Sequence, residues 1–148
     1  MRRTDQRRAA VFGCYQQVVT GTAVEELLER GVLSARAEDD RERPPAPAGE
    51  YTRELLGGLA EHAEELDRLI AEHAIGWELE RIAPLERCVL RVALYEILHR
   101  PDVPDEVAID EAVETAKLYC GVDAPAFVNG ILGGVMKRLE RDVKGRRS

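Results

Sequence analysis

The sequence predicts an all-α protein built from about six or seven helices. Apolar residues recur at intervals of three and four in one segment after another, and no segment shows the strict alternation of a strand. Proline and glycine separate these segments by mostly short connections, so we expect antiparallel neighbouring helices. The 148 residues are 45% hydrophobic and 33% charged, which suits one core and a single domain over residues 1–148.

The first two helices are predicted near the N-terminus. Residues 4–20 carry apolar side chains along one face, and Gly21 is placed to end that helix. Residues 22–25 (Thr-Ala-Val-Glu) have the capping-box pattern, which predicts a short second helix running to Gly31. Residues 34–49 are rich in charge and proline without an apolar period, so we expect an exposed loop there. The apolar face of the first helix comprises Val11, Cys14, Tyr15 and Val18.

A long third helix is predicted over residues 51–73. Its leucine stripe includes two histidines, which we interpret as hydrogen-bonded or partly exposed structural residues. Gly57 and Gly58 interrupt the stripe and would allow another helix to approach closely. The stripe comprises Leu55, Leu59, His62, Leu66, Leu69 and His73.

Three further helices complete the predicted fold. Residues 85–98 contain ten apolar or aromatic side chains among fourteen, so this helix must be covered on nearly every side. Pro84 suits its first turn, where a missing N–H is not needed. We expect Asp105 to cap a helix over residues 107–120. The last helix is predicted to start near residues 123–125 and to keep an apolar face as far as Leu139.

Charge is unevenly distributed along the chain. The net charge is −7, which alone argues against nucleic-acid binding. Residues 1–8, a basic arm, carry four arginines and one aspartate, and residues 137–148, a basic tail, carry six Lys or Arg and two acids. The remainder is therefore strongly acidic. This pattern fits a protein with a basic patch for phosphate and an acidic face for a basic protein, although solubilising tails are the simpler interpretation of either end alone.

Membrane insertion and a disulfide or zinc framework are not expected. The longest stretch without charge, residues 9–24, spans 16 residues and includes polar side chains, whereas a membrane helix needs about 18 to 20 apolar residues. The basic start lacks a cleavage pattern, so we expect a soluble cytoplasmic protein. The three cysteines, Cys14, Cys88 and Cys120, are far apart and form no C-x-x-C pair.

No catalytic or metal site is predicted, and no cofactor. The only E-x-x-H pair is Glu96 with His99, whereas a di-iron bundle needs two such pairs. The chain contains neither a G-x-G-x-x-G motif nor a P-loop lysine. We therefore expect a protein that is not an enzyme.

An ordered series of motifs follows the arginine-rich first helix: residues 86–96 (ERCVLRVALYE), 102–104 (DVP), 107–113 (VAIDEAV), 116–117 (AK) and 127–132 (FVNGIL). Together they resemble the NusB family of bacterial transcription antitermination factors. The resemblance implies an all-helical fold of about seven helices in two helical subdomains, without catalysis. It also implies a complex with NusE, a small-subunit ribosomal protein, that binds single-stranded boxA RNA and so reaches the transcribing RNA polymerase indirectly.

The residues expected to bind RNA are of several chemical kinds. The arginines of the basic arm would follow phosphates, and Tyr15 would stack on unpaired bases. By resemblance, Phe127 lies at the RNA surface with Asn129 near the same helix start, and Glu86 lies where RNA and protein partner meet. Packing is the rival explanation for Tyr15 and Phe127. The arginines are Arg2, Arg3, Arg7 and Arg8, and the further acidic candidates for the protein partner are Glu96, Asp110 and Glu111.

Some positions depart from the family pattern. Ala126 stands where family members often have a basic residue, which would weaken binding to RNA alone, and Asp110 and Gly133 also differ. The alternative function is a protein-interaction or homodimerising module with no RNA role of its own. A similar domain also precedes the catalytic domain of certain ribosomal RNA cytosine methyltransferases, but this sequence contains no methyltransferase segment.

Overall fold

The structure is a computed structural model, and it describes residues 2–30, 49–74, 76 and 79–146. Within these residues the chain forms six α-helices and one short 3-10 turn, so the prediction of an all-α fold is confirmed. The exposed loop predicted over residues 34–49 lies almost entirely outside the described residues.

The N-terminal helices form where the sequence predicts them. Helix α1 (Arg3–Thr20) ends at Gly21, which adopts a left-handed φ of 74° that glycine tolerates without strain. The Gly21 N–H donates to the carbonyl of Gln17 and thereby satisfies one of the last carbonyls of the helix. Helix α2 (Val24–Arg30) follows after three residues.

Helix α3 (Glu50–His73) is the long third helix, and it is kinked. The kink falls at His62, where φ is −110° and ψ is 15°, rather than at the paired glycines. A 3-10 turn, η2 (Leu79–Arg81), then leads to the central helix.

The C-terminal half contains three helices. Helix α4 (Pro84–His99) has Pro84 in its first turn, as predicted. Helix α5 (Asp105–Tyr119) begins one residue earlier than a cap at Asp105 would require: Pro104 holds the cap position, and Asp105 is the first helical residue. Helix α6 (Ala124–Arg146) is longer than its apolar face suggests.

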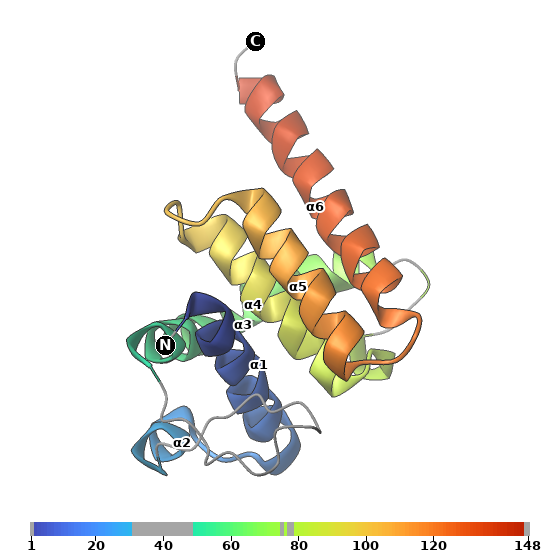
Figure 1. Cartoon of the computed structure of the whole chain (residues 1–148). Coiled ribbons are helices and arrows are strands. Elements are labelled where there is room, and N and C mark those ends of the chain that lie inside the picture. Colours follow the sequence, from blue (N-terminus) through green and yellow to red (C-terminus); the bar gives the residue numbers. More distant parts are fainter. Residues whose placement is uncertain (1, 31–48, 75, 77–78, 147–148) are drawn as a thin grey trace.

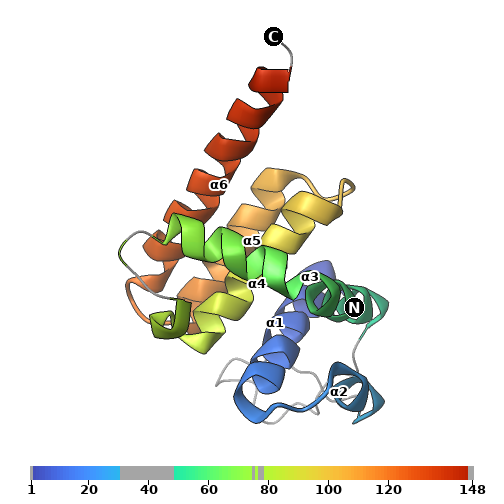
Figure 2. The ribbon, with the colours of Figure 1, turned by 180° about the vertical axis from the view of Figure 1, so that it is seen from behind.

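Helix α4 lies at the centre of the fold. It packs against α1, α3, α5 and α6, and Figures 1 and 2 show it enclosed between them while the C-terminal part of α6 projects away from the rest. The prediction that this helix is covered on nearly every side is confirmed by its buried residues, which are Cys88, Val89, Leu90, Val92, Ala93, Leu94 and Glu96. One hydrophobic cluster includes residues from all six helices. None of the described helices is long and apolar enough to cross a membrane.

Gly58 allows α3 to approach α4 closely. A Cβ atom built on Gly58 would collide with the ring of Tyr95, whereas a Cβ on the adjacent Gly57 would meet nothing within 4 Å. The predicted close packing at the paired glycines therefore depends on Gly58 alone.

This asymmetry predicts opposite effects for two neighbouring substitutions. We expect Gly58→Ala to destabilise the protein by about 1–3 kcal/mol, because the new methyl group displaces the Tyr95 ring. Gly57→Ala is the matched control and should stabilise by about 0.5–1 kcal/mol, since alanine costs less backbone entropy in a helix. Urea unfolding of both variants measures the difference, and equal free energies of unfolding would contradict the packing described here.

Candidate nucleic-acid interface

Arg7 of α1 is bonded to Glu96 of α4 inside the protein. The Arg7 side chain is 8% exposed and that of Glu96 is 1% exposed. The Nε of Arg7 lies 2.9 Å from both carboxylate oxygens of Glu96, and the Tyr51 hydroxyl donates to Oε2 of the same carboxylate. Because both charges are buried, each needs the other to offset its lost hydration.

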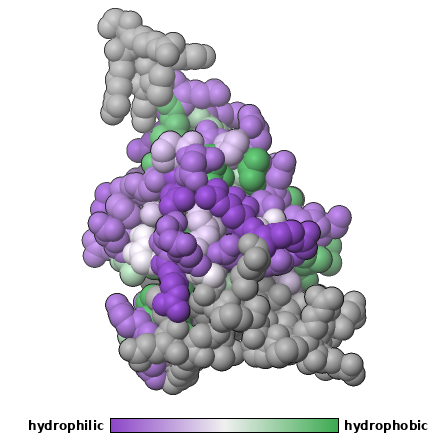
Figure 3. All heavy atoms as spheres, turned by 60° about the vertical axis from the view of Figure 1, so that its left-hand side comes forward, coloured by the Kyte–Doolittle hydropathy of each residue, from purple (hydrophilic) through white to green (hydrophobic). Residues whose placement is uncertain are grey.

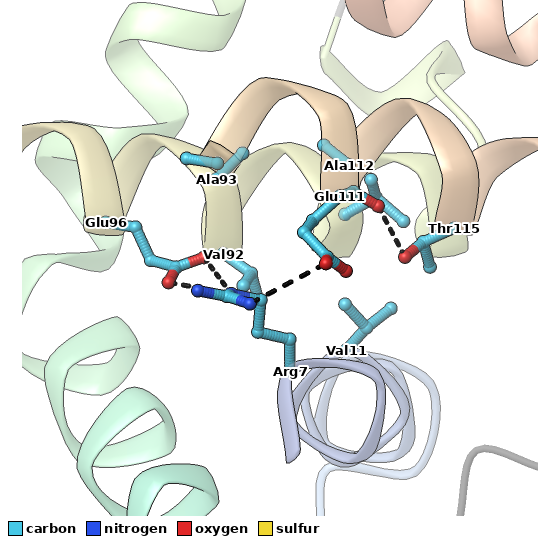
Figure 4. A pocket seen from close by; sticks show the side chains of 10 residues that line it. Arg7, Val11, Val92, Ala93, Glu96, Glu111, Ala112 and Thr115 are labelled. Atoms are coloured by element: carbon cyan, nitrogen blue, oxygen red, sulfur yellow. Dashed lines mark hydrogen bonds and ion pairs between the residues drawn. The ribbon is translucent and has the colours of Figure 1, made fainter. Parts of the chain in front are cut away.

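Glu111 of α5 completes this network. Its Oε1 accepts a hydrogen bond from the Thr4 hydroxyl at 2.8 Å and lies 3.9 Å from a terminal nitrogen of Arg7. The Thr115 hydroxyl donates to the Glu111 carbonyl at 2.7 Å. Figure 4 shows Arg7 extending from α1 between Glu96 and Glu111, so one guanidinium joins three helices.

Three arginines surround the ring of Tyr51 next to this network. The guanidinium carbons of Arg3, Arg7 and Arg100 lie 4.4, 5.7 and 5.1 Å from the ring centroid. Arg3 and Arg100 both contact Asp102, at 3.1 Å each. Burial, together with the nearby Glu96 carboxylate, raises the pKa of Tyr51, so its hydroxyl stays protonated and remains a donor. No local pattern in the sequence predicts this cluster, because its members come from different elements.

The opposite end of α4 contributes to a groove. Glu86 and Phe127 both line it, so the start of α4 and the start of α6 meet there. Partial burial raises the pKa of Glu86. Burial also raises the pKa of Cys120, at the end of α5, to about 11, with a further contribution from the negative charge of Glu86. The remaining residues that line the groove are Arg81, Ile82, Ala83, Asp123 and Ala124.

Helix α1 runs antiparallel to α4. Near its start Arg7 contacts Glu96, and further along the Cys14 sulfur lies 3.7 Å from a terminal nitrogen of Arg91, closer to the start of α4. Phe12 meets Tyr119 of α5 edge to face, with ring centroids 5.1 Å apart. Tyr15, the residue after Cys14, is half-buried and packed against the core.

The structure separates the predicted site residues into two groups. Arg3, Arg7 and Glu96 lie at the C-terminal end of α4, whereas Glu86 and Phe127 lie at its N-terminal end. Ten residues of helix separate Glu86 from Glu96, which corresponds to about 15 Å along the axis. These groups cannot act as one compact site.

The other predicted residues differ in exposure. Arg2 is a surface side chain, 86% exposed, and lies 3.7 Å from Asp5. Arg8 is half-buried, and its Nε is covered without a hydrogen-bond partner among the described residues. Asn129 and Asp110 are exposed. Arg7 is not a surface cation and Glu96 is not a surface acid, because each is buried against the other; α1 already begins at Arg3, so Arg7 belongs to a packed helix rather than to a free arm.

The side of the molecule on the left in Figure 1 is predominantly hydrophilic where it is described, as Figure 3 shows. The fold and these surfaces define a class of protein: a small all-α protein in which polar and aromatic groups from several helices surround both ends of the central helix.

Comparison with known proteins identifies the family. The NusB family model matches residues 4–137. The transcription antitermination protein NusB of Symbiobacterium thermophilum is 43% identical over 144 residues, covering 95% of this chain and 92% of that protein. The chain therefore belongs to the NusB family.

Solved structures agree with this assignment. The T. maritima NusB structure superposes with a TM-score of 0.76 at 34% identity, covering 93% of this chain and 92% of that chain. A chain in the crystal structure of antitermination factors NusB and NusE in complex with dsRNA superposes with a TM-score of 0.74 at 25% identity, covering 92% of this chain and 96% of that chain.

The buried ion pair predicts a large cost for removing one partner. We expect Arg7→Ala to lower the free energy of unfolding by about 3–5 kcal/mol, because Glu96 is left buried and unpaired. Arg2→Ala, at an exposed arginine of the same segment, should change it by less than about 0.5 kcal/mol. Chemical denaturation compares the two. A double variant, Arg7→Met with Glu96→Met, should be more stable than Arg7→Ala, and similar stabilities for Arg7→Ala and Arg2→Ala would refute the burial.

The proximity of Glu86 to Cys120 predicts a change in thiol reactivity. We expect Glu86→Gln to lower the pKa of Cys120 from about 11, because the negative charge that disfavours the thiolate is removed. The profile of Cys120 alkylation rate against pH, followed by mass spectrometry, should therefore move to lower pH. Glu114→Gln, an exposed acid on α5, is the control. A profile that moves equally in both variants would argue against a specific effect of Glu86.

Proposed function

We propose that this chain is a non-enzymatic, cytoplasmic RNA-binding adaptor that acts with the ribosomal protein NusE on boxA RNA to promote antitermination of ribosomal RNA transcription. The observation that carries the proposal is the similarity, over more than nine tenths of the chain, to a chain in the structure of NusB and NusE in complex with dsRNA. Contact with the transcribing RNA polymerase would be indirect, through this assembly.

The groove end of α4 is the part of the surface best suited to RNA. Phe127 is half-buried, packs against the core and lines the groove, so its ring would offer a surface on which a base can stack. A base stacked on an aromatic ring contributes about 1–3 kcal/mol. Asn129, exposed two residues later, offers donors and an acceptor for a base edge. Glu86 would accept from a base or ribose, or pair with the basic protein partner.

Phosphate binding is assigned to Arg2 and Arg8. Arg2 is exposed beyond the start of α1. Arg8 lies seven residues before Tyr15, so the side chains of Arg8 and Tyr15 share one face of the helix about 10 Å apart. The Arg8 stem is packed against the protein, which restricts the position of its guanidinium. A single strand that stacks on Tyr15 would therefore bring a phosphate within reach of Arg8.

Arg7 and Glu96 have a positioning role in this proposal. Their buried pair fastens the start of α1 to α4 and so sets where Arg8 and Tyr15 lie relative to the groove. The acidic surface for NusE would use exposed Asp110 and the outer edge of Glu111, both on α5.

Fluorescence anisotropy tests the function directly. A short boxA RNA and a scrambled RNA of the same composition are titrated at one fixed salt concentration, with and without NusE, since the phosphate contribution depends steeply on salt. We expect tighter and sequence-selective binding when NusE is present.

Three substitutions test the site within that assay. Phe127→Ala and Tyr15→Ala should each weaken binding of boxA by roughly 5- to 150-fold, which corresponds to a stacking contribution of 1–3 kcal/mol, and should reduce discrimination against the scrambled RNA. Arg8→Ala should weaken both RNAs alike and lower the salt slope by about 1. Arg68→Ala, an exposed arginine in a separate hollow beside His99, is the control for lost charge.

The alternative outcomes are distinct. Capture of NusE with equal or absent binding of both RNAs would indicate a protein-interaction module instead. Light scattering at several concentrations identifies a homodimer that hides the RNA surface until NusE is added. Unchanged RNA binding in all three folded variants would refute the site assignment while leaving the adaptor function.

A further inference from the structure

Two of the three histidines in the sequence lie against each other in the structure. The rings of His62 and His99 are stacked, with centroids 3.9 Å apart and an interplanar angle of 20°. The Nε2 atom of His99 lies 2.8 Å from Oε1 of Glu65. One ligand atom from each of the three residues can be chosen so that all lie within 4.8 Å of one another.

Two helices bring these groups together. His62 and Glu65 are three residues apart on α3 and therefore occupy neighbouring positions on one face, while His99 is the last residue of α4. The kink in α3 falls at His62, whose backbone lies outside the helical region.

Tyr95 supports the two imidazole rings. Its ring centroid lies 6.0 Å from that of His62 and 5.4 Å from that of His99. Tyr95 is in turn held by the close approach of Gly58, where no side chain intervenes. The packing of α3 on α4 therefore determines the positions of both histidine rings.

The site is open to solution. The Glu65 side chain is 48% exposed and that of His99 is 29% exposed. Two hollows adjoin the cluster, one lined by residues 60–65 with Arg68 and the other containing Glu65, Arg68, Glu72, His99 and Arg138. Glu61 and Glu64 add negative charge on the same helix, whereas Arg68 adds positive charge and Arg138 is paired with Glu72. An ion can therefore enter the cluster from solvent, where the Glu65 carboxylate favours a cation.

We propose that His62, Glu65 and His99 form a binding site for a divalent transition-metal ion of the Zn²⁺ type. Two imidazole nitrogens and one carboxylate oxygen are the donor set found in many zinc sites, and they also suit Co²⁺ and Ni²⁺. With three protein ligands, at least one coordination position remains for water. The ion replaces the proton that His99 and Glu65 share in their hydrogen bond.

The geometry requires only small movements. A tetrahedral Zn²⁺ ion with bonds of about 2.0–2.1 Å holds its ligand atoms about 3.3 Å apart. The contact between His99 and Glu65 would lengthen slightly from 2.8 Å, and the widest separation would close from 4.8 Å. Both movements are rotations of partly exposed side chains. The bound ion then links α3, at its kink, to the end of α4.

No local motif in the sequence signals this cluster. The one E-x-x-H pair is Glu96 with His99, but in the structure Glu96 is buried and bonded to Arg7. The partners of His99 come instead from a helix more than thirty residues away in the sequence. The expectation of no metal site considered only groups that are close together in the sequence.

Calorimetric titration with Zn²⁺ at neutral pH tests the proposal, with Co²⁺ absorption as a second readout. All proteins carry Cys120→Ser, because this thiol is half-buried whereas Cys14 and Cys88 are buried, which makes it the cysteine most accessible to added metal. We expect one ion per chain and an increase in Tm on adding Zn²⁺, by mass action on the folded state. Nitrogen and oxygen ligation predicts a Co²⁺ spectrum without thiolate charge-transfer absorption.

Single variants assign the ligands. Loss of even an outer partner of a metal ligand costs roughly 10- to 100-fold in affinity, so we expect His62→Ala and His99→Ala each to weaken Zn²⁺ binding at least ~100-fold. Glu65→Gln should weaken it less and leaves both rings in place. His73→Ala is the matched control: His73 is on the same helix, and its Nδ1 lies 2.8 Å from the carbonyl oxygen of Leu69.

The proposal is overturned if the starting protein binds no Zn²⁺, or if His73→Ala weakens binding as much as His99→Ala. It is also overturned if His62→Ala and His99→Ala, folded by circular dichroism, bind as tightly as the starting protein. Should either alanine variant fail to fold, Glu65→Gln decides the question, because retention of full affinity in that variant rejects the three-ligand site.

Discussion

The buried pair between Arg7 and Glu96 is the constraint on which the arrangement of the helices depends. A guanidinium and a carboxylate removed from water offset their desolvation only when they face each other in one geometry. Here that geometry is met by bonds to both carboxylate oxygens, with the Tyr51 hydroxyl as a further donor and Glu111 nearby. Any displacement of α1 along α4 would leave these charges unpaired. The pair therefore fixes the register of α1 against α4, which hydrophobic contacts alone would specify more loosely.

The central helix connects the buried ion pair to the proposed RNA surface. At one end of α4 the ion pair holds α1, α3 and α5 together, and at the other end Glu86 lies in a groove with Phe127 of α6. Because α1 runs antiparallel to α4, a register set at Arg7 also determines where Tyr15 lies along α4. In the proposed function, Arg8 contacts phosphate and Arg7 positions the helix, although the two arginines are adjacent in the basic arm.

Periodicity was sufficient to predict the helices, because burying an apolar face requires little information beyond its spacing. The long helix at residues 51–73 and the central helix after Pro84 were both predicted in this way. Periodicity did not predict the kink at His62, which depends on packing between helices. Periodicity also did not predict which of Gly57 and Gly58 contacts another helix, since only the fold places the ring of Tyr95 against Gly58.

The roles of the charged residues were harder to predict than the helices, because their partners also meet only through the packing of one helix on another. A run of arginines looks like a solvated arm until the partner of each one is known, and the partner of Arg7 is 89 residues away. Glu96 looked like a surface acid because nothing in its local sequence signals an ion pair. His62 and His99 likewise come together only through the packing of α3 on α4.

In the proposed function, RNA contacts α1 and the groove end of α4, while the cluster around Tyr51 is structural. Photocrosslinking of thiouridine-substituted boxA RNA to the complex with NusE, followed by mapping of the crosslinked residues by mass spectrometry, distinguishes these two surfaces. We expect crosslinks at Phe127 and Tyr15. Crosslinks concentrated at Tyr51 and its surrounding arginines, with none at the groove, would show that RNA binds the other end of α4.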